Sequence, residues 1–231
     1  MADPGIDPAD VWFVIPAFNE GSAVGRVVAS VRAAYPNVIV VDDASTDNSA
    51  AVARHFGACV VRHPVNLGQG AALQTGIELA LSRGAPFIVT FDADGQHHVE
   101  DVAGMLMLAR RTGADLVLGS RFLGNTIGMP ASRRLLLKAA TLFTRLTVGL
   151  PLTDCHNGLR LLTRHAASCM QLRQNRMAHA SELLATIRRC GLRHVEAPVT
   201  ISYTDYSRAK GQRLGDALVV FKDLLTARLA R

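Results

Sequence analysis

Residues 86–97 read Pro-Phe-Ile-Val-Thr-Phe-Asp-Ala-Asp-Gly-Gln-His, an apolar run that ends in an acidic motif. The run predicts a buried parallel strand whose carboxyl end reaches solvent at Asp92. Asp92 and Asp94 follow that strand directly, and Gln96 adds a neutral oxygen on the same side. Such oxygen ligands suit Mg²⁺ or Mn²⁺, which keep positions open for substrate phosphates. The motif therefore predicts a metal site, with capping of the next helix as the alternative.

The rest of the first half alternates between two kinds of pattern. Apolar runs predict strands at 11–15, 38–41, 58–61 and 115–118, and helical periodicity predicts helices at 22–34, 45–55, 70–81 and 99–110. Ser45 or Thr46 is the expected N-cap of the second helix. Strands separated by helices of this length predict βαβ units, with helices on both faces of a parallel sheet. Ligands of such sheets bind at the carboxyl ends of the strands.

The second half is less regular. Its patterns predict a helix at 133–149, a turn into a strand at 154–162, a helix at 180–190, a strand at 195–203, a polar and basic segment at 205–213 and an amphipathic helix at 214–231. Neither an internal repeat nor a linker divides the chain. We therefore expect a tail at 1–10, one domain at 11–213 and a C-terminal helix at 214–231.

Composition limits the functional classes. The 231 residues contain no apolar stretch of the ~18 uncharged residues that span a membrane, and the acidic, proline-containing N-terminus does not resemble a signal peptide, so we expect a cytoplasmic protein. The four cysteines form no Cys-x-x-Cys pair, which argues against a zinc site or a disulfide framework. A net charge of +6 implies anionic partners. Because the cations are scattered and few aromatic residues accompany them, we expect phosphorylated metabolites or an anionic membrane and no nucleic acid.

Polar residues follow the other strands as well. Phe18 and Glu20 can stack on and hydrogen-bond to a nucleoside, although residues 16–20 can equally form a plain strand-to-helix turn. Asp43 can accept a hydrogen bond from a base or a ribose, with helix capping as the alternative. Gly68 opens a helix whose free N–H groups attract anions.

Taken in order, residues 14–20, 41–47, 66–70 and 92–97 resemble the motifs of family 2 glycosyltransferases with the GT-A fold. The likeness is greatest to the dolichyl- and polyprenyl-phosphate hexose synthases. It continues through 119–122, 154–160 and 181–182, and covers about residues 11–215. It implies an α/β fold: a GT-A, Rossmann-like, mostly parallel sheet flanked by helices in a single domain.

The resemblance also implies roles for individual residues. Nucleotide-binding residues would be Pro16, Phe18, Glu20, Val41, Asp43, Gly68, Asp92, Ala93, Asp94 and Lys210. Asp94 and Gln96 would ligate the metal, and Asp92, Asp94 and Arg121 would be the catalytic residues. Arg121, Arg133 and Arg160 would contact the acceptor phosphate, with Arg134 as a further candidate. The relatives usually carry Gly-x-Ser-Lys in a C-terminal loop, whereas this chain has Ser207-Arg208-Ala209-Lys210, so that either Arg208 or Lys210 can close over the diphosphate.

The implied activity is metal-dependent, inverting transfer of a hexose from a nucleotide sugar to a polyprenyl or dolichyl phosphate. UDP is the first candidate nucleotide and GDP the alternative. A surface polysaccharide or another glycan is the alternative acceptor, and a catalytically inactive nucleotide-sugar-binding subunit of a membrane complex is the alternative function.

Two apolar segments that also carry cations, at 135–146 and 218–229, indicate where in the cell the protein acts. Each can lie in a membrane interface, dock onto a small membrane-protein partner, or simply cover the sheet. We therefore expect a peripheral protein at the cytoplasmic face of the membrane. His97 adjoins the acidic motif and can touch metal or sugar, whereas His98 is expected at the surface or behind the site.

Overall fold

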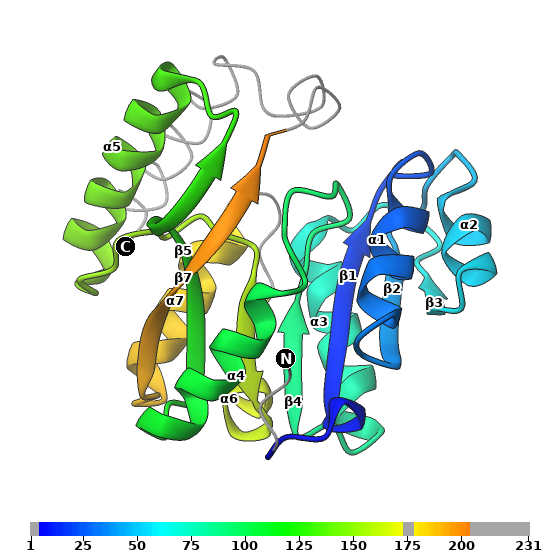
Figure 1. The fold of residues 1–231 in the computed structure, drawn as a ribbon, viewed down its shortest axis with the longest axis horizontal. Coiled ribbons are helices and arrows are strands. Elements are labelled where there is room, and N and C mark those ends of the chain that lie inside the picture. The colour runs from blue at the N-terminus through cyan, green and yellow to red at the C-terminus, as the bar shows by residue number, and fades with distance from the viewer. Residues whose placement is uncertain (1–4, 173–177, 204–231) are drawn as a thin grey trace.

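A seven-stranded sheet runs through the computed structural model, which describes residues 5–172 and 178–203 (Figure 1). The strands lie in the order β3-β2-β1-β4-β6-β5-β7. Their bounds are β1 Val11–Ala17, β2 Asn37–Asp42, β3 Cys59–Arg62, β4 Phe87–Thr90, β5 Leu116–Ile127, β6 Arg160–Thr163 and β7 His194–Ser202. All neighbouring pairs are parallel except the two that β6 makes with β4 and β5. The predicted, mostly parallel sheet is confirmed.

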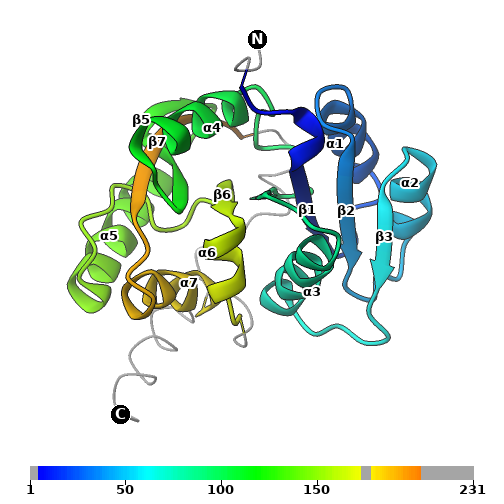
Figure 2. The ribbon, with the colours of Figure 1, turned by 90° about the horizontal axis from the view of Figure 1, so that it is seen from below.

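Helices cover both faces of this sheet, as predicted. The α-helices are α1 Val24–Arg32, α2 Ser49–His55, α3 Gln69–Ser82, α4 Asp101–Thr112, α5 Ala131–Val148, α6 Arg164–Cys169 and α7 Ala178–Arg189, and a short 3₁₀ turn at Pro8–Asp10 precedes β1. Figure 2 shows α1 and α4 on one face and α3, α6 and α7 on the other. Helix α5 lies at the edge beyond β5 and β7 (Figure 1).

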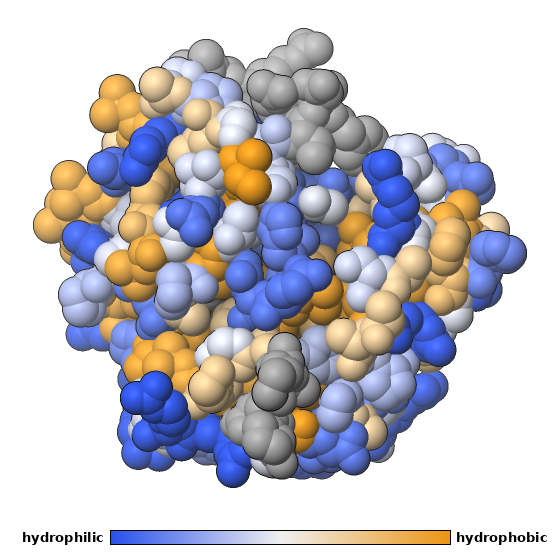
Figure 3. Space-filling model, in the orientation of Figure 1, coloured by the Kyte–Doolittle hydropathy of each residue, from blue (hydrophilic) through white to orange (hydrophobic). Residues whose placement is uncertain are grey.

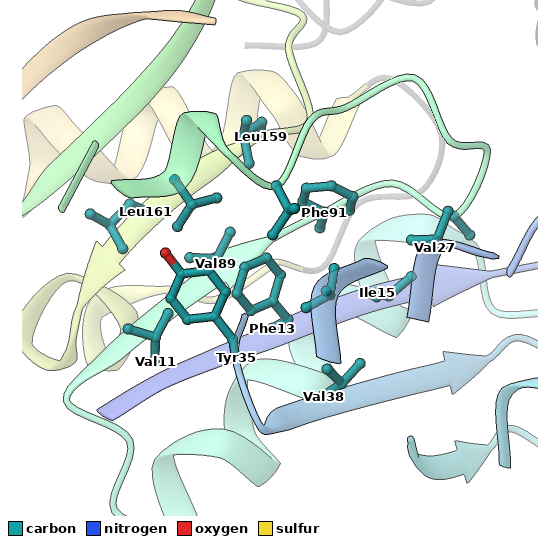
Figure 4. Close-up of a cluster of buried hydrophobic side chains, with 14 of the residues drawn as sticks. Val11, Phe13, Ile15, Val27, Tyr35, Val38, Val89, Phe91, Leu159 and Leu161 are labelled. Carbon is teal, nitrogen blue, oxygen red and sulfur yellow. The ribbon is translucent and has the colours of Figure 1, made fainter. Parts of the chain in front are cut away.

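Each face of the sheet has its own apolar core, because side chains alternate along every strand. On β1, Phe13 packs towards α1 and α4, whereas Val14 packs towards α3. The Phe13 ring lies 5.1 Å from the ring of Tyr35 and 5.6 Å from that of Phe91 (Figure 4). Phe91 immediately precedes Asp92, so this aromatic cluster anchors the start of the acidic motif.

Two local predictions were wrong, and one helix was missed. The second helix begins at Ser49, four residues later than expected, because the Ser45 hydroxyl accepts a hydrogen bond from the Asn19 amide instead of capping a helix. The fifth strand does not end at residue 118 but continues to Ile127 through an irregularity in its pairing with β7 between Ser120 and Asn125. Helix α6 was not predicted, since its six residues are too few for a periodic pattern.

Candidate functional site

The loops after β1 and β2 are tied to each other at the carboxyl edge of the sheet. The Asn19 amide donates to Ser45 Oγ at 2.9 Å, the Thr46 amide donates to Asn19 Oδ1 at 2.9 Å, and the Glu20 amide donates to Ser49 Oγ at 2.8 Å. Asn19 adopts a left-handed conformation with φ of 54°, which a short polar side chain tolerates. Phe18 is 45% exposed beside this joint, so residues 16–20 and 42–49 form one polar rim with an accessible ring.

Asp43, predicted to bind a nucleoside, is buried and organises the neighbouring loop. Its Oδ1 accepts from the Leu67 amide at 2.8 Å, and its Oδ2 accepts from the Gly68 amide at 2.7 Å. His63 Nδ1 lies 2.8 Å from Oδ1, and His63 Nε2 lies 3.0 Å from Thr75 Oγ1. Asp43 thus fixes the start of α3. Sequence reasoning missed His63, which follows β3 without any recognisable motif.

The acidic motif forms the centre of the site. Burial, together with the negative charge of Asp92, raises the pKa of Asp94 to about 6, and the charge of Glu20 adds a smaller effect in the same direction. The backbone amide and the Nε2 of Gln96 donate to the two Asp94 oxygens at 3.0 and 2.8 Å. Gly95, with φ of 76°, makes the turn that brings Gln96 back to Asp94. Asp92, Asp94 and Glu20 therefore concentrate negative charge where the loops after β1 and β4 meet.

This environment fits a divalent cation chemically. Carboxylate and amide oxygens are hard ligands, and two acidic groups that resist simultaneous ionisation are stabilised by a bound positive charge. Within the described ranges, no three His, Cys, Asp or Glu side chains converge into a complete metal cage. An ion at Asp94 would therefore take further oxygens from the Gln96 amide and from substrate phosphates.

Asp92 is held by contacts from several elements. His97 Nε2 lies 2.9 Å from Asp92 Oδ2, and Gln69 Nε2, at the start of α3, donates to Oδ1 at 3.3 Å. The His97 side chain is only 3% exposed, so it faces Asp92 rather than the solvent. His98 Nε2 lies 2.8 Å from Ser202 Oγ and ties the same loop to β7, behind the site.

Arg121 lies in a buried ion pair. Its Nε donates to Asp154 Oδ2 at 2.6 Å, its Nη1 to the Tyr203 hydroxyl at 2.8 Å and its Nη2 to the His156 carbonyl at 3.0 Å. Burial lowers the pKa of Arg121, but the Asp154 and Tyr203 interactions outweigh it, and the pKa is raised overall. Arg121 therefore connects β5 to the loop that leads into β6. A direct contact between Arg121 and a phosphate stays a prediction.

The other two predicted acceptor-binding arginines differ from each other. The Arg133 guanidinium, on α5, lies 5.2 Å above the Tyr203 ring, in cation–π contact. Arg160, at the start of β6, is 4% exposed. Burial lowers the pKa of Arg160, although the charges of Asp92 and Asp154 oppose that shift. A buried guanidinium whose charge interacts with Asp92 adds positive charge beside the acidic motif, which suits an anionic ligand.

Comparison with known proteins agrees with this geometry. Residues 12–170 match the model of glycosyl transferase family 2. The chain belongs to this family. It is 31% identical to an undecaprenyl-phosphate mannosyltransferase of Micrococcus luteus, over 90% of this chain and 91% of that protein. It is 29% identical to the UDP-N-acetylglucosamine–dolichyl-phosphate N-acetylglucosaminyltransferase of Methanococcus voltae, over 96% of this chain and 97% of that protein.

The fold of this family 2 glycosyltransferase also matches solved structures. Glucosyl-3-phosphoglycerate synthase from Mycobacterium tuberculosis, crystallised with Mn²⁺ and UDP-glucose, superposes with a TM-score of 0.71. The match covers 97% of this chain and 84% of that chain, at 20% identity. The predicted GT-A fold is confirmed, and the chain is a glycosyltransferase.

The remaining predicted residues of the glycosyltransferase site occupy different environments. The side chains of Pro16, Val41 and Ala93 are buried, so a direct side-chain contact of these three residues with a nucleotide stays a prediction. Gly68 precedes α3 with φ of 91°, a conformation that favours glycine. Lys210, Arg208 and the predicted helix at 214–231 lie outside the described residues.

Proposed function

We propose that this enzyme transfers a hexose, with inversion, from a UDP-linked sugar to a polyprenyl phosphate. The observation that carries the proposal is the concentrated negative charge of Asp92, Asp94 and Glu20 beside the exposed ring of Phe18. The ring and the polar rim suit a nucleoside, and the carboxylates suit a metal-bound diphosphate. The names of the relatives from Micrococcus luteus and Methanococcus voltae support a polyprenyl-type acceptor.

The roles of the side chains follow from this arrangement. Asp94 and Gln96 would hold Mg²⁺ or Mn²⁺, which when bound neutralises charge that develops on the departing nucleoside diphosphate. Phe18 and Glu20 would hold the nucleoside, and Asp92 would orient the sugar-bearing end of the donor. A lipid phosphate is already an anionic nucleophile, so a single displacement needs no strong general base. Arg160 and Arg133 would hold that phosphate opposite the leaving group.

The donor is tested by calorimetry of UDP and GDP binding, with Mn²⁺, with Mg²⁺ and with EDTA. Metal-dependent binding of UDP supports the proposal, whereas binding of GDP alone changes the donor. Transfer from the matching nucleotide sugar to polyprenyl phosphate then tests the acceptor. A soluble glycan accepting the sugar in place of the lipid phosphate would move the proposal to the alternative acceptor. A folded protein that binds the nucleotide but transfers nothing in the presence of metal would support the inactive-subunit alternative.

Helix α5 supports a peripheral location at the membrane. Its Leu135, Leu142 and Leu146 side chains are 72%, 57% and 77% exposed, and Leu123 and Ile127 of β5 are 50% and 57% exposed. Figure 3 shows apolar side chains at the left edge, where α5 lies in Figure 1. Helix α5 contains no Asp or Glu but four cations: Arg133, Arg134, Lys138 and Arg145. An apolar helix that carries cations and no carboxylate complements an anionic lipid surface.

No described helix is both long enough and apolar enough to cross a bilayer. The membrane proposal is therefore tested by flotation with vesicles of phosphatidylglycerol. The paired variant Leu135→Ser and Leu146→Ser should lose flotation, whereas Met107→Ser should keep it, because Met107 is 44% exposed on the distant helix α4. Flotation that is absent in the wild-type protein, or equal in both variants, would refute a membrane contact through α5.

A further inference from the structure

We infer that His97 is a positioning residue for Asp92, and the inference rests on the proposed role of Asp92 in donor binding. The His97 side chain is 3% exposed and that of Asp92 is 31% exposed, so a ligand can reach Asp92 but not the imidazole behind it. The 2.9 Å contact between His97 Nε2 and Asp92 Oδ2 is the route by which His97 acts on the site.

The imidazole is itself fixed in place. The backbone of His97 pairs with Ile201, and the Ser202 amide donates to the Gln96 carbonyl at 2.9 Å, so β7 holds this loop. The His97 ring also packs edge-on against Phe91, with 5.3 Å between ring centroids. Phe91 belongs to the aromatic cluster under β1 and β4. The core and β7 thus hold His97 in place, and His97 in turn holds the Asp92 carboxylate.

The hydrogen-bond pattern defines which nitrogen carries the proton. Asp92 Oδ2 is an acceptor, so the Nε2–H form of His97 donates to it. His97 Nδ1 is buried, and no group in 5–172 or 178–203 lies within hydrogen-bond reach of it. A proton on Nδ1 would therefore be a buried, unpaired donor, which is unfavourable. The geometry selects the Nε2–H tautomer.

Two further contacts restrain Asp92. Gln69 donates to its other oxygen, and Gly158 packs against the carboxylate so closely that an added Cβ would lie 2.2 Å from Oδ2. The Gly158 carbonyl accepts a hydrogen bond of 2.6 Å from Thr90 Oγ1, which fixes that loop. These contacts together restrict the orientation of the carboxylate. Within this set, the His97 N–H donates directly to the oxygen that Gly158 crowds.

Side-chain geometry supplies a matched pair of variants. The amide nitrogen of glutamine can occupy the place of the imidazole Nε2, whereas the shorter asparagine side chain reaches only the place of Nδ1. We expect His97→Gln to keep kcat within about threefold of wild type, and His97→Asn to lower it roughly 10- to 100-fold, as for other residues that orient site groups. The donor KM should change less than kcat, because Asp92 remains present but is misplaced. His55→Asn, at an exposed site on α2, is the control and should match wild type.

Equal losses in His97→Gln and His97→Asn, or no loss in either, would overturn the inference. Should both variants fail to fold, nitrogen-15 NMR of the ligand-free wild-type protein decides instead. The Nε2–H tautomer of His97 is expected, with a change in its nitrogen shifts in Asp92→Asn, and an Nδ1–H tautomer would refute the contact. This second measurement needs no turnover. A protein that shows the expected tautomer but transfers no sugar would refute the proposed function and leave the positioning role standing.

Discussion

Asp94 should destabilise the ligand-free enzyme at neutral and alkaline pH, and its replacement by asparagine should reveal by how much. Burial and the charge of Asp92 raise its pKa from 3.8 to about 6. One pKa unit is worth about 1.4 kcal/mol, so ionised Asp94 costs the folded state about 3 kcal/mol. Asparagine resembles the protonated acid and avoids that cost. In a chain of this size, a gain of about 3 kcal/mol raises Tm by about 6–12 °C.

The sign of the pH dependence follows from proton linkage. The folded chain binds the Asp94 proton more tightly than the unfolded chain, so this group's contribution to stability is intact below about pH 4 and is lost as pH rises through about 6. The advantage of Asp94→Asn should therefore be about 3 kcal/mol at about pH 8, about 1.5 kcal/mol at about pH 5, and nearly zero at about pH 3.

Urea unfolding in EDTA at these pH values measures the difference. Asp10→Asn, at an exposed site just before β1, is the control and should change the free energy of unfolding by less than about 0.5 kcal/mol at every pH. Saturating Mn²⁺ should stabilise the wild-type protein but not Asp94→Asn, because only the carboxylate gains from the ion. An Asp94→Asn variant that is no more stable at about pH 8, or whose advantage does not change with pH, would refute the reasoning.

Two other substitutions test the packing around the site. Gly158→Ala should lower the rate of sugar transfer roughly 10-fold or more, because the new Cβ would push the Asp92 carboxylate aside. Gly104→Ala on α4 is the control, since its new Cβ meets no atom within 4 Å and should leave transfer unchanged. Equal rates in both variants would refute the restraint on Asp92. Asp43→Ala should lower the free energy of unfolding by about 2–4 kcal/mol in urea, since the Leu67 and Gly68 amides lose their acceptor, and a loss below about 1 kcal/mol would show that water replaces the carboxylate.

The elements that the sequence predicts correctly are those with a local signal. Strands β1, β2 and β4 are short apolar runs that end in polar residues, and α3 and α4 have a full helical period. The acidic motif is equally local, because Asp92, Asp94 and Gln96 lie within five residues and their turn depends only on Gly95. Such features can be recognised without knowledge of what packs against them.

The contacts that define the site are long-range, and this is why the sequence could not predict them. His63 reaches Asp43 across 20 residues, and the Arg121 guanidinium reaches the Tyr203 hydroxyl across 82. Arg121 lies within β5 in a motif that suggests a phosphate contact, yet Asp154, 33 residues later, already accepts from its Nε. Ser45 stands where the N-cap of a helix is expected, but its hydroxyl accepts a hydrogen bond from the Asn19 amide of another loop.

The same charges that weaken the fold are those that the proposed chemistry requires. The fold itself does not require two carboxylates at the end of β4. With an uncharged residue in place of Asp92, ionised Asp94 would destabilise the folded state less. Contacts from His97, Gln69 and Gly158 nevertheless hold the Asp92 charge close to Asp94. Holding these two like charges together lowers the stability of the folded state. A bound divalent cation would offset the repulsion between the two carboxylates and so stabilise the folded state. Metal binding at the donor site is therefore coupled to folding stability, and the pH dependence of unfolding in EDTA measures how strongly the empty site destabilises the enzyme.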